Sequence, residues 1–180
     1  MTGQEGREAA REAAVARAAA ACSSAAAWLA SAGVPSEALA QYVPARRKLL
    51  VTRKPTMQPL GRVWRIGTLL LAEDGRLFAH GRSTRAAERG RPGYQSLSRE
   101  ERREIAAAAL RGGFAEGEPV NFDAVPLGFP PAPAPTDDDP ALPVGYADGD
   151  FRVRWRAGAP LAGAPPLAAF FNDRLPLLAP

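Results

Sequence analysis

The chain has 180 residues, a hydrophobic content of 46% and a formal net charge of +4, which allow one folded domain with its own core. A single cysteine excludes a disulfide scaffold within the chain. Cys22 and His80 are its only soft ligands and lie far apart in the sequence, so we expect no metal and no cofactor.

The first predicted element is an Ala-rich helix over residues 5–32. Fourteen of the first 33 residues are Ala, the strongest helix former, and Gly33 ends the pattern. Val15, Cys22 and Leu29 recur every seven residues and form a thin apolar seam. This seam can pack on its own domain, or it can contact a protein partner or a second copy in a homodimer.

The chain divides on composition into a helix over 1–33 and a single α+β domain over 34–180. Within this domain, residues 128–143 hold six prolines and an Asp run, which predicts an exposed linker. No stretch reaches the roughly 18 consecutive apolar residues of a membrane span. Acidic residues near the start, Glu5 among them, do not fit a secretory leader. We therefore expect a cytoplasmic protein without membrane contact.

A short second helix is predicted from Ser36 to Tyr42, because Ser36 can cap it and Pro44 stops it. Residues 46–54 follow as a short apolar stretch bracketed by five cations. That pattern favours an edge strand or an extended segment.

The clearest unit is a hairpin with strands over 64–72 and 77–81. Asp74-Gly75 suits a two-residue type I′ turn, because both positions need positive φ. This turn sets the register and places Leu69 opposite His80. Since both faces are apolar near the turn, we expect the hairpin to be central and covered on each side.

A third helix is predicted to begin with a capping box at Ser98 and Glu101 and to run to about Arg111, where Gly112 helps to end it. Residues 120–122 then alternate as a short strand. The helix presents one apolar stripe, which consists of Ile105, Ala106, Ala109 and Leu110.

A second hairpin turns at Asp148-Gly149 and places Tyr146 opposite Phe151 on its apolar face. A final helix is predicted over 166–175. The other face of the second hairpin carries a row of three arginines, Arg152, Arg154 and Arg156.

Strand pairs and helices therefore come in segregated runs, which is typical of an α+β fold. We expect a single antiparallel sheet of about four to six strands, built from the two Asp-Gly hairpins. Its helices should pack mainly on one face of that sheet.

Catalytic signals are sparse. His80 is the only residue with an ordinary pKa near neutrality, so it is the one candidate general base. Neither Lys48 nor Lys54 follows a serine at the Ser-x-x-Lys spacing, and Cys22 lies in an Ala-rich helix as inert packing. Asp137–Asp139 lack the alternating spacing of a calcium loop.

Arginine is the one abundant functional group, with 21 of the 23 basic residues. Residues 46–91 hold twelve basic and three acidic residues, whereas 92–150 hold four basic and eleven acidic. Arginine binds carboxylates and phosphates through two parallel hydrogen bonds. These groups can form an anion site, or they can solvate a strand and pair with the acidic half of the chain. The candidate anion- or ligand-binding residues are Arg82, Arg85, Arg152, Arg154 and Arg156.

Several motifs carry a resemblance to a known family: Gly61–Leu71, Asp74–Ala79, Thr84–Ala86, Glu101–Arg103 and Gly117–Phe122. Together they resemble a family of short uncharacterised proteins of high-GC Gram-positive bacteria. The resemblance covers roughly residues 58–127 and 151–178. Some members carry an automatic glutaminase label, which implies an amide-directed hydrolase. Neither the Ser-x-x-Lys motif of serine-type glutaminases nor a cysteine on a strand-to-helix turn is present here.

Three functions stay open on the sequence. The first is a non-enzymatic binding protein that contacts a small anionic ligand or a protein partner through its arginines. The second is a small hydrolase that uses His80 as general base. The third is a nucleic-acid accessory protein, which the scarcity of lysine disfavours.

Overall fold

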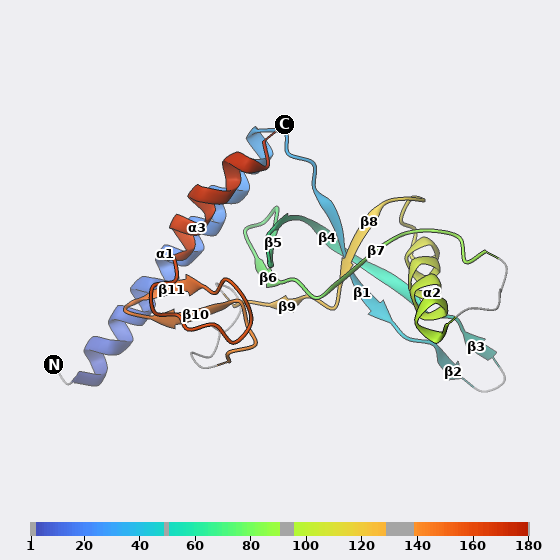
Figure 1. The fold of residues 1–180 in the computed structure, drawn as a ribbon, viewed down its shortest axis with the longest axis horizontal. Helices are drawn as coiled ribbons and strands as arrows, with labels where there is room; N and C mark the ends of the chain where they lie inside the picture. Colours follow the sequence, from blue (N-terminus) through green and yellow to red (C-terminus); the bar gives the residue numbers. More distant parts are fainter. Residues whose placement is uncertain (1–2, 49–50, 91–95, 129–138, 180) are drawn as a thin grey trace. The chain divides into compact units, whose positions relative to one another are not determined.

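The structure is a computed structural model that describes residues 3–48, 51–90, 96–128 and 139–179 (Figure 1). Its elements in chain order are α1 (Gly3–Ser31), β1 (Glu37–Val43), β2 (Arg46–Lys48), β3 (Val51–Arg53), β4 (Thr56–Ile66), β5 (Leu69–Ala72), β6 (Leu77–Ala79), β7 (Arg82–Arg85), α2 (Leu97–Arg111), β8 (Pro119–Phe122), β9 (Val125–Pro126), β10 (Val144–Ala147), β11 (Asp150–Val153), α3 (Leu167–Arg174) and the 3-10 helix η1 (Leu175–Leu177).

The fold is α+β, as predicted, but the sheet differs from the prediction. Seven strands form one mixed sheet in the order β7-β8-β1-β4-β5-β6-β9. β8 pairs antiparallel with β7 and parallel with β1, so the sheet is not purely antiparallel. The second Asp-Gly hairpin forms a separate two-stranded sheet, β10-β11, and β2-β3 forms another. Two similar turns suggested one shared sheet, but a turn carries no information about which strands lie side by side.

The chain divides by its contacts into two compact units. Unit 1 comprises Met1–Pro35, Trp64–Ala79 and Val125–Pro180, and unit 2 comprises Ser36–Val63 and His80–Ala124. Each unit has a hydrophobic core of its own. The expected division at residue 33 rests on the helix end alone, whereas these contacts group α1 with two later segments of the chain.

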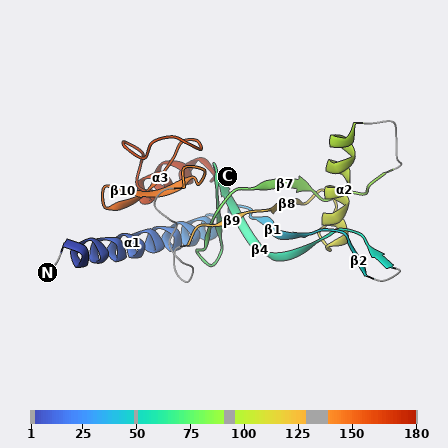
Figure 2. The same ribbon diagram turned by 90° about the horizontal axis from the view of Figure 1, so that it is seen from below.

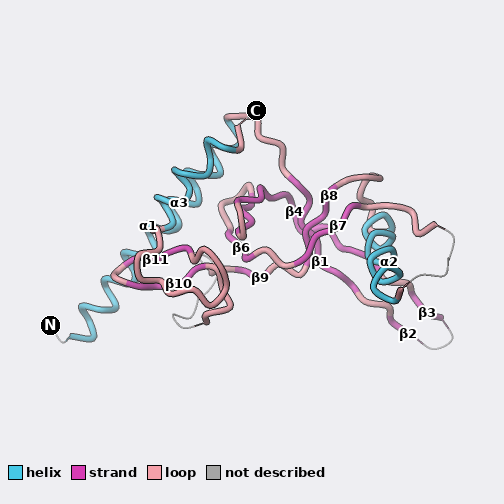
Figure 3. Tube along the Cα trace, viewed as in Figure 1, coloured by secondary structure: helices cyan, strands magenta, loops and turns pink. Residues whose placement is uncertain are grey.

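Helix α1 packs within unit 1, where it contacts α3, β11 and β5. Figure 3 shows α1 and α3 side by side. Of the predicted seam, Cys22 and Leu29 are fully buried and Val15 is half-buried. The seam therefore packs on its own unit. A partner or homodimer contact through this helix stays a prediction, and it would have to use the outward residues.

One helix of the described chain, over Gln4–Ser31, is long and apolar enough to cross a membrane by length and composition alone. A helix packed in a protein core has the same length and composition. Several residues of this helix are buried in the core of unit 1.

The first predicted hairpin exists, but its register is shifted by one residue. The long strand predicted over 64–72 is divided by a turn, which leaves β5 to begin at Leu69. Leu69 lies opposite Ala79 rather than opposite His80. The loop has three residues instead of two, because the N–H of Ala72 bonds to the carbonyl of Arg76 at 2.8 Å. Both strands are buried on both faces, as predicted.

The second hairpin has the predicted two-residue turn and register. Tyr146 lies opposite Phe151. Asp148 and Gly149 both have positive φ, at +52° and +78°, as a type I′ turn requires. The predicted terminal helix is also present as α3, and its Leu167 is buried.

In unit 2, the helix predicted over Ser36–Tyr42 is wrong, because Glu37–Val43 form the strand β1. Their Ala and Leu content favours a helix, but β1 is paired on both sides, antiparallel with β4 and parallel with β8. Residues 38–40 are buried in that position. Tertiary pairing thus overrides a weak local preference.

Helix α2 belongs to unit 2 and contacts β7; Figures 1 and 2 show the helix from two directions. Its end at Arg111 was predicted, but the capping box is wrong: Ser96 is the N-cap, with no side-chain cap bond, and Ser98 lies inside the helix. The apolar stripe is also shifted, since Ala106 and Leu110 are only half-buried. The buried residues are Ile105, Ala107, Ala108 and Ala109.

Candidate functional site

The β2–β3 hairpin continues the β1–β4 ladder of unit 2. Val43 and Thr56 form the last pair of that ladder. The chain between them makes a second antiparallel pair, in which Arg46 lies opposite Arg53. Helix α2 anchors the base of the hairpin, because Arg111 Nε donates to the carbonyl of Pro55 at 2.8 Å.

Four cations of this hairpin are exposed: Arg46, Arg47, Arg53 and Lys54. We call these four residues the basic hairpin. No side-chain hydrogen bond or ion pair joins any of these four cations to a residue that the structure describes. Moreover, the sequence contains no acidic residue from Ala38 to Ala72. The hairpin therefore carries positive charge that no acidic residue close to it in the sequence neutralises.

The register makes this arrangement unfavourable for the isolated fold. Arg46 and Arg53 are direct cross-strand partners, so their side chains lie on one face. Like charges directly opposite each other destabilise a strand pair. A short two-stranded hairpin is marginally stable to begin with. An anion bound between the two guanidinium groups would remove this repulsion.

The candidate arginines on β7 both have partners inside unit 2. Arg82 forms ion pairs with Glu101 at 3.3 Å and with Asp123 at 3.9 Å. Its guanidinium also lies over the ring of Phe122 at 5.1 Å. Arg85 donates to the carbonyl of Gly117 at 3.0 Å. This geometry supports pairing with the acidic half of the chain, which was the second interpretation of the sequence.

The arginine row of unit 1 does not form one open surface. Arg154 is buried, and it donates to the carbonyls of Ala159 at 2.9 Å and Leu142 at 3.2 Å. Its guanidinium occupies the space that a side chain at Gly145 would need, since a Cβ there would lie 2.8 Å from Nη1. The Arg154 side chain therefore packs against Gly145 of the β10–β11 hairpin and stabilises it through two backbone carbonyls.

The two neighbours of Arg154 in that row differ from it. Arg152 is half-buried and donates to the carbonyls of Ala164 at 2.6 Å and Ala147 at 3.2 Å. Arg156 is exposed and stacks on the ring of Trp155 at 4.5 Å. Among the three arginines of the row, Arg156 alone is exposed, so these contacts argue against an anion site built from all three.

The catalytic candidates do not form a constellation. His80 follows the last residue of β6 and is half-buried. Burial raises the pKa of the Cys22 thiol from 9.0 to about 12, which disfavours the nucleophilic thiolate. In the part of the chain that the structure describes, no group of three His, Cys, Asp or Glu residues could hold a metal ion. Asp137 and Asp138 lie outside the described residues.

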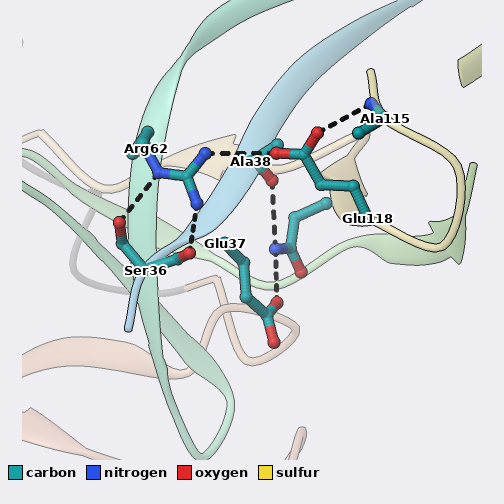
Figure 4. Close-up of polar contacts among 7 residues, drawn as sticks. Ser36, Glu37, Ala38, Arg62, Ala115 and Glu118 are labelled. Carbon is teal, nitrogen blue, oxygen red and sulfur yellow. Dashed lines mark hydrogen bonds and ion pairs between the residues drawn. The ribbon is translucent and has the colours of Figure 1, made fainter. Parts of the chain in front are cut away.

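A buried polar cluster, which the sequence analysis missed, ties β8 to β1 (Figure 4). Asn121 is fully buried. Its amide donates to Glu37 Oε2 at 2.7 Å and to the carbonyl of Ala38 at 3.2 Å. These bonds span the parallel β1–β8 pair. An Asn between the apolar residues of a strand is the sequence signal, because a buried amide needs partners.

Arg62 forms the second half of the same cluster. Its guanidinium donates to the side chain of Ser36 at 2.9 Å and also to the Ser36 carbonyl. It further bonds Glu118 Oε1 at 3.1 Å, and Glu118 in turn accepts from the N–H of Ala115 at 3.0 Å (Figure 4). These bonds connect β1, β4, β8 and the loop before β8, so we assign the cluster a structural role.

A largely apolar groove of about 490 Å³ lies between α1 and α3 in unit 1. Trp28 and Phe171 are among its lining residues, together with Arg17. The Arg17 guanidinium donates to the carbonyl of Gly149 at 2.7 Å and pairs with Asp150. The groove thus offers apolar surface, and its one cation is already held by the protein.

In the sequence, the basic hairpin belongs to a group of five cations around a short apolar stretch, a pattern that predicted only an edge strand or an extended segment. The signal in the sequence is the absence of acidic residues from Ala38 to Ala72, rather than the number of arginines. Comparison of the chain with protein-family models, with curated proteins and with solved structures finds no match. The resemblance to a family of short proteins of high-GC Gram-positive bacteria therefore stays a prediction.

Proposed function

We propose that this protein is a non-enzymatic binding protein whose basic hairpin contacts a polyanion. One observation carries the proposal: the four cations of the hairpin are exposed, and their side chains have no partner among the described residues. Two other exposed arginines of unit 2 do have acidic partners, whereas Arg99 on α2 has none in the described part of the chain and lies outside the hairpin. Arg82 and Arg89, with side chains 51% and 52% exposed, both pair with glutamates of α2.

The energetics favour a ligand with several negative charges. A single exposed ion pair contributes about 0–1 kcal/mol, because water and salt screen it. One carboxylate or one phosphate would therefore bind weakly to this surface. Four cations that act together on a repeating anion gain several such terms and also release its counterions. The proposal thus moves the anion-contacting surface from the five predicted arginines to the basic hairpin.

The hydrolase alternative gains no support from the geometry. It rests on His80 alone, and the buried Cys22 thiol supplies no nucleophile at neutral pH. A cytoplasmic location belongs to the same proposal, since intracellular polyanions are abundant there and Cys22 would stay reduced.

The experiment is salt elution of the full chain from immobilised heparin, which presents a generic polyanion. The test variant is Arg46→Gln/Arg47→Gln/Arg53→Gln. The matched control is Arg99→Gln/Arg102→Gln/Arg156→Gln, which removes the same charge from three exposed arginines elsewhere. We expect wild type and control to elute at similar salt and the test variant to elute far earlier. Equal losses in both variants would show that only net charge matters, and would overturn the proposal.

A further inference from the structure

We infer that the polyanion is a DNA duplex, and that the basic hairpin enters its major groove with cations facing both phosphate walls. This inference rests on the proposed function and names the ligand of the same site. It is carried by three properties of the hairpin: the distribution of its cations over two faces, its dimensions, and the residue types that flank them.

The cations lie on both faces of the hairpin. Arg46 and Arg53 are register partners and share one face, whereas the adjacent Arg47 points to the opposite face. A planar anionic surface, such as a lipid bilayer, contacts one face of a ribbon and leaves the other in water. A groove with phosphates along both edges contacts both faces. The two-sided distribution therefore favours a groove.

The dimensions of a two-stranded ribbon match the major groove. A sheet with its side chains is about 10 Å thick, and the major groove of B-form DNA is about 12 Å wide. Each strand of the hairpin has three residues, Arg46–Lys48 and Val51–Arg53, which span roughly 10 Å at about 3.3 Å per residue. The groove is about 8.5 Å deep. The minor groove, at about 6 Å, is too narrow for the ribbon.

The residue types disfavour other nucleic acids. Proteins that bind single strands place aromatic rings under successive bases, and residues 44–55 contain no aromatic residue. The major groove of an A-form RNA duplex is narrow and deep, which excludes a ribbon with side chains. The segment lacks Asn and Gln, which read adenine, whereas its arginines and lysines can contact both phosphates and guanine edges. We therefore expect phosphate contacts to dominate, with guanine as the one base that the hairpin can read.

The test measures binding of the full chain to a fluorescent 20-base-pair DNA duplex of mixed sequence between 50 and 200 mM salt. If all four cations meet phosphates, the slope of log K against log salt should be about −3.6, at −0.9 per phosphate. The triple variant of Arg46, Arg47 and Arg53 should reduce that slope to about −0.9. The control variant at Arg99, Arg102 and Arg156 should keep the wild-type slope. Circular dichroism verifies that each variant is folded.

Competitor ligands decide the inference. A single strand or an RNA duplex of the same sequence should bind at least tenfold more weakly than the DNA duplex; equal binding of either would overturn the groove. Preferential binding to vesicles that contain phosphatidylserine would replace DNA by a membrane surface. Heparin retention that depends on the hairpin, without duplex binding, would refute this inference and leave the proposed function intact. If the triple variant also elutes from heparin at the same salt as wild type, both the proposed function and this inference are refuted.

Discussion

Two arginine-bearing hairpins of this protein use the same residue in opposite ways. In β10–β11, Arg154 is buried and bonds two backbone carbonyls. In β2–β3, Arg46 and Arg53 are exposed and face each other across the ladder. The first hairpin uses its guanidinium groups to hold a loop against a core, whereas the second presents them to solvent. An arginine pattern alone therefore does not reveal a binding surface; the location of its acceptors does.

The difference arises from the chain that surrounds each hairpin. The carbonyl acceptors of Arg152 and Arg154 include those of Ala164 and Ala159, in the loop that follows β11. That loop returns over the hairpin, because the N–H of Val153 bonds to the carbonyl of Pro165 at 2.9 Å. No comparable segment among the described residues supplies acceptors to the basic hairpin.

The largest expected effect concerns the buried guanidinium. Arg154→Ala should lower the free energy of unfolding by about 3 kcal/mol, because it leaves buried carbonyls without donors and opens a cavity. Arg156 lies two residues further along the chain and is exposed, so Arg156→Ala should change the free energy of unfolding by less than about 0.5 kcal/mol. Urea denaturation measures both. Similar effects for the two variants would erase the distinction between the buried and exposed arginines.

The next effect uses Cys22, which lies in the same core as Val144 and Phe151 of β10–β11. Burial raises the pKa of its thiol from 9.0 to about 12, so the folded state holds this proton more tightly than the unfolded state. The contribution of the thiol is complete below pH 9 and is lost as the pH rises towards 12. The loss should reach about 1.4 kcal/mol per pH unit.

Urea denaturation of wild type and Cys22→Ala at pH 8, 9 and 10 isolates this contribution, because lysine and tyrosine titrate equally in both proteins. The stability difference between them should narrow with pH. If this stability difference stays constant with pH, the Cys22 thiol is not buried from solvent as the structure shows. The Cys22 thiol should also be alkylated faster in Arg154→Ala than in wild type. Substitutions in the basic hairpin should leave its alkylation rate unchanged.

A smaller effect is expected at the β10–β11 turn. Gly149 has φ +78°, a conformation that L side chains rarely adopt. Gly149→Ala should therefore destabilise the protein by about 1 kcal/mol. Gly6→Ala, in an open position of α1, should instead be neutral or stabilising. Thermal denaturation compares the two variants, and a neutral Gly149→Ala would contradict the turn type.

The smallest effect should have the opposite sign. Arg46→Thr removes the repulsion with Arg53 and introduces a residue that favours strands, so stability should rise by a few tenths of a kcal/mol. The same variant should elute earlier from heparin. A gain in stability with a loss of binding would show that the paired arginines are kept for the ligand. A loss of both would instead assign them a structural role.

Elements set by neighbours in sequence were predicted well. Helix α1 follows from its alanines, α2 ends at its glycines, and the β10–β11 register follows from Asp148-Gly149. The β5–β6 hairpin shows the limit of this reasoning. Asp74-Gly75 fits a two-residue turn equally well, yet the chain forms a three-residue loop that shifts Leu69 opposite Ala79. Both loops satisfy the local turn chemistry, and packing of the strands selects between them.

The sequence by itself determined the α+β class, the positions of the three helices, the turn of the second hairpin and the segregation of charge along the chain. Tertiary structure alone decided that residues 37–43 form a strand, that β8 lies parallel to β1, and which arginines find acceptors. The reason is physical. Helix propensity, caps and turns act over a few residues, whereas strand order and the desolvation of a guanidinium depend on groups that are remote in sequence and are brought together only by folding.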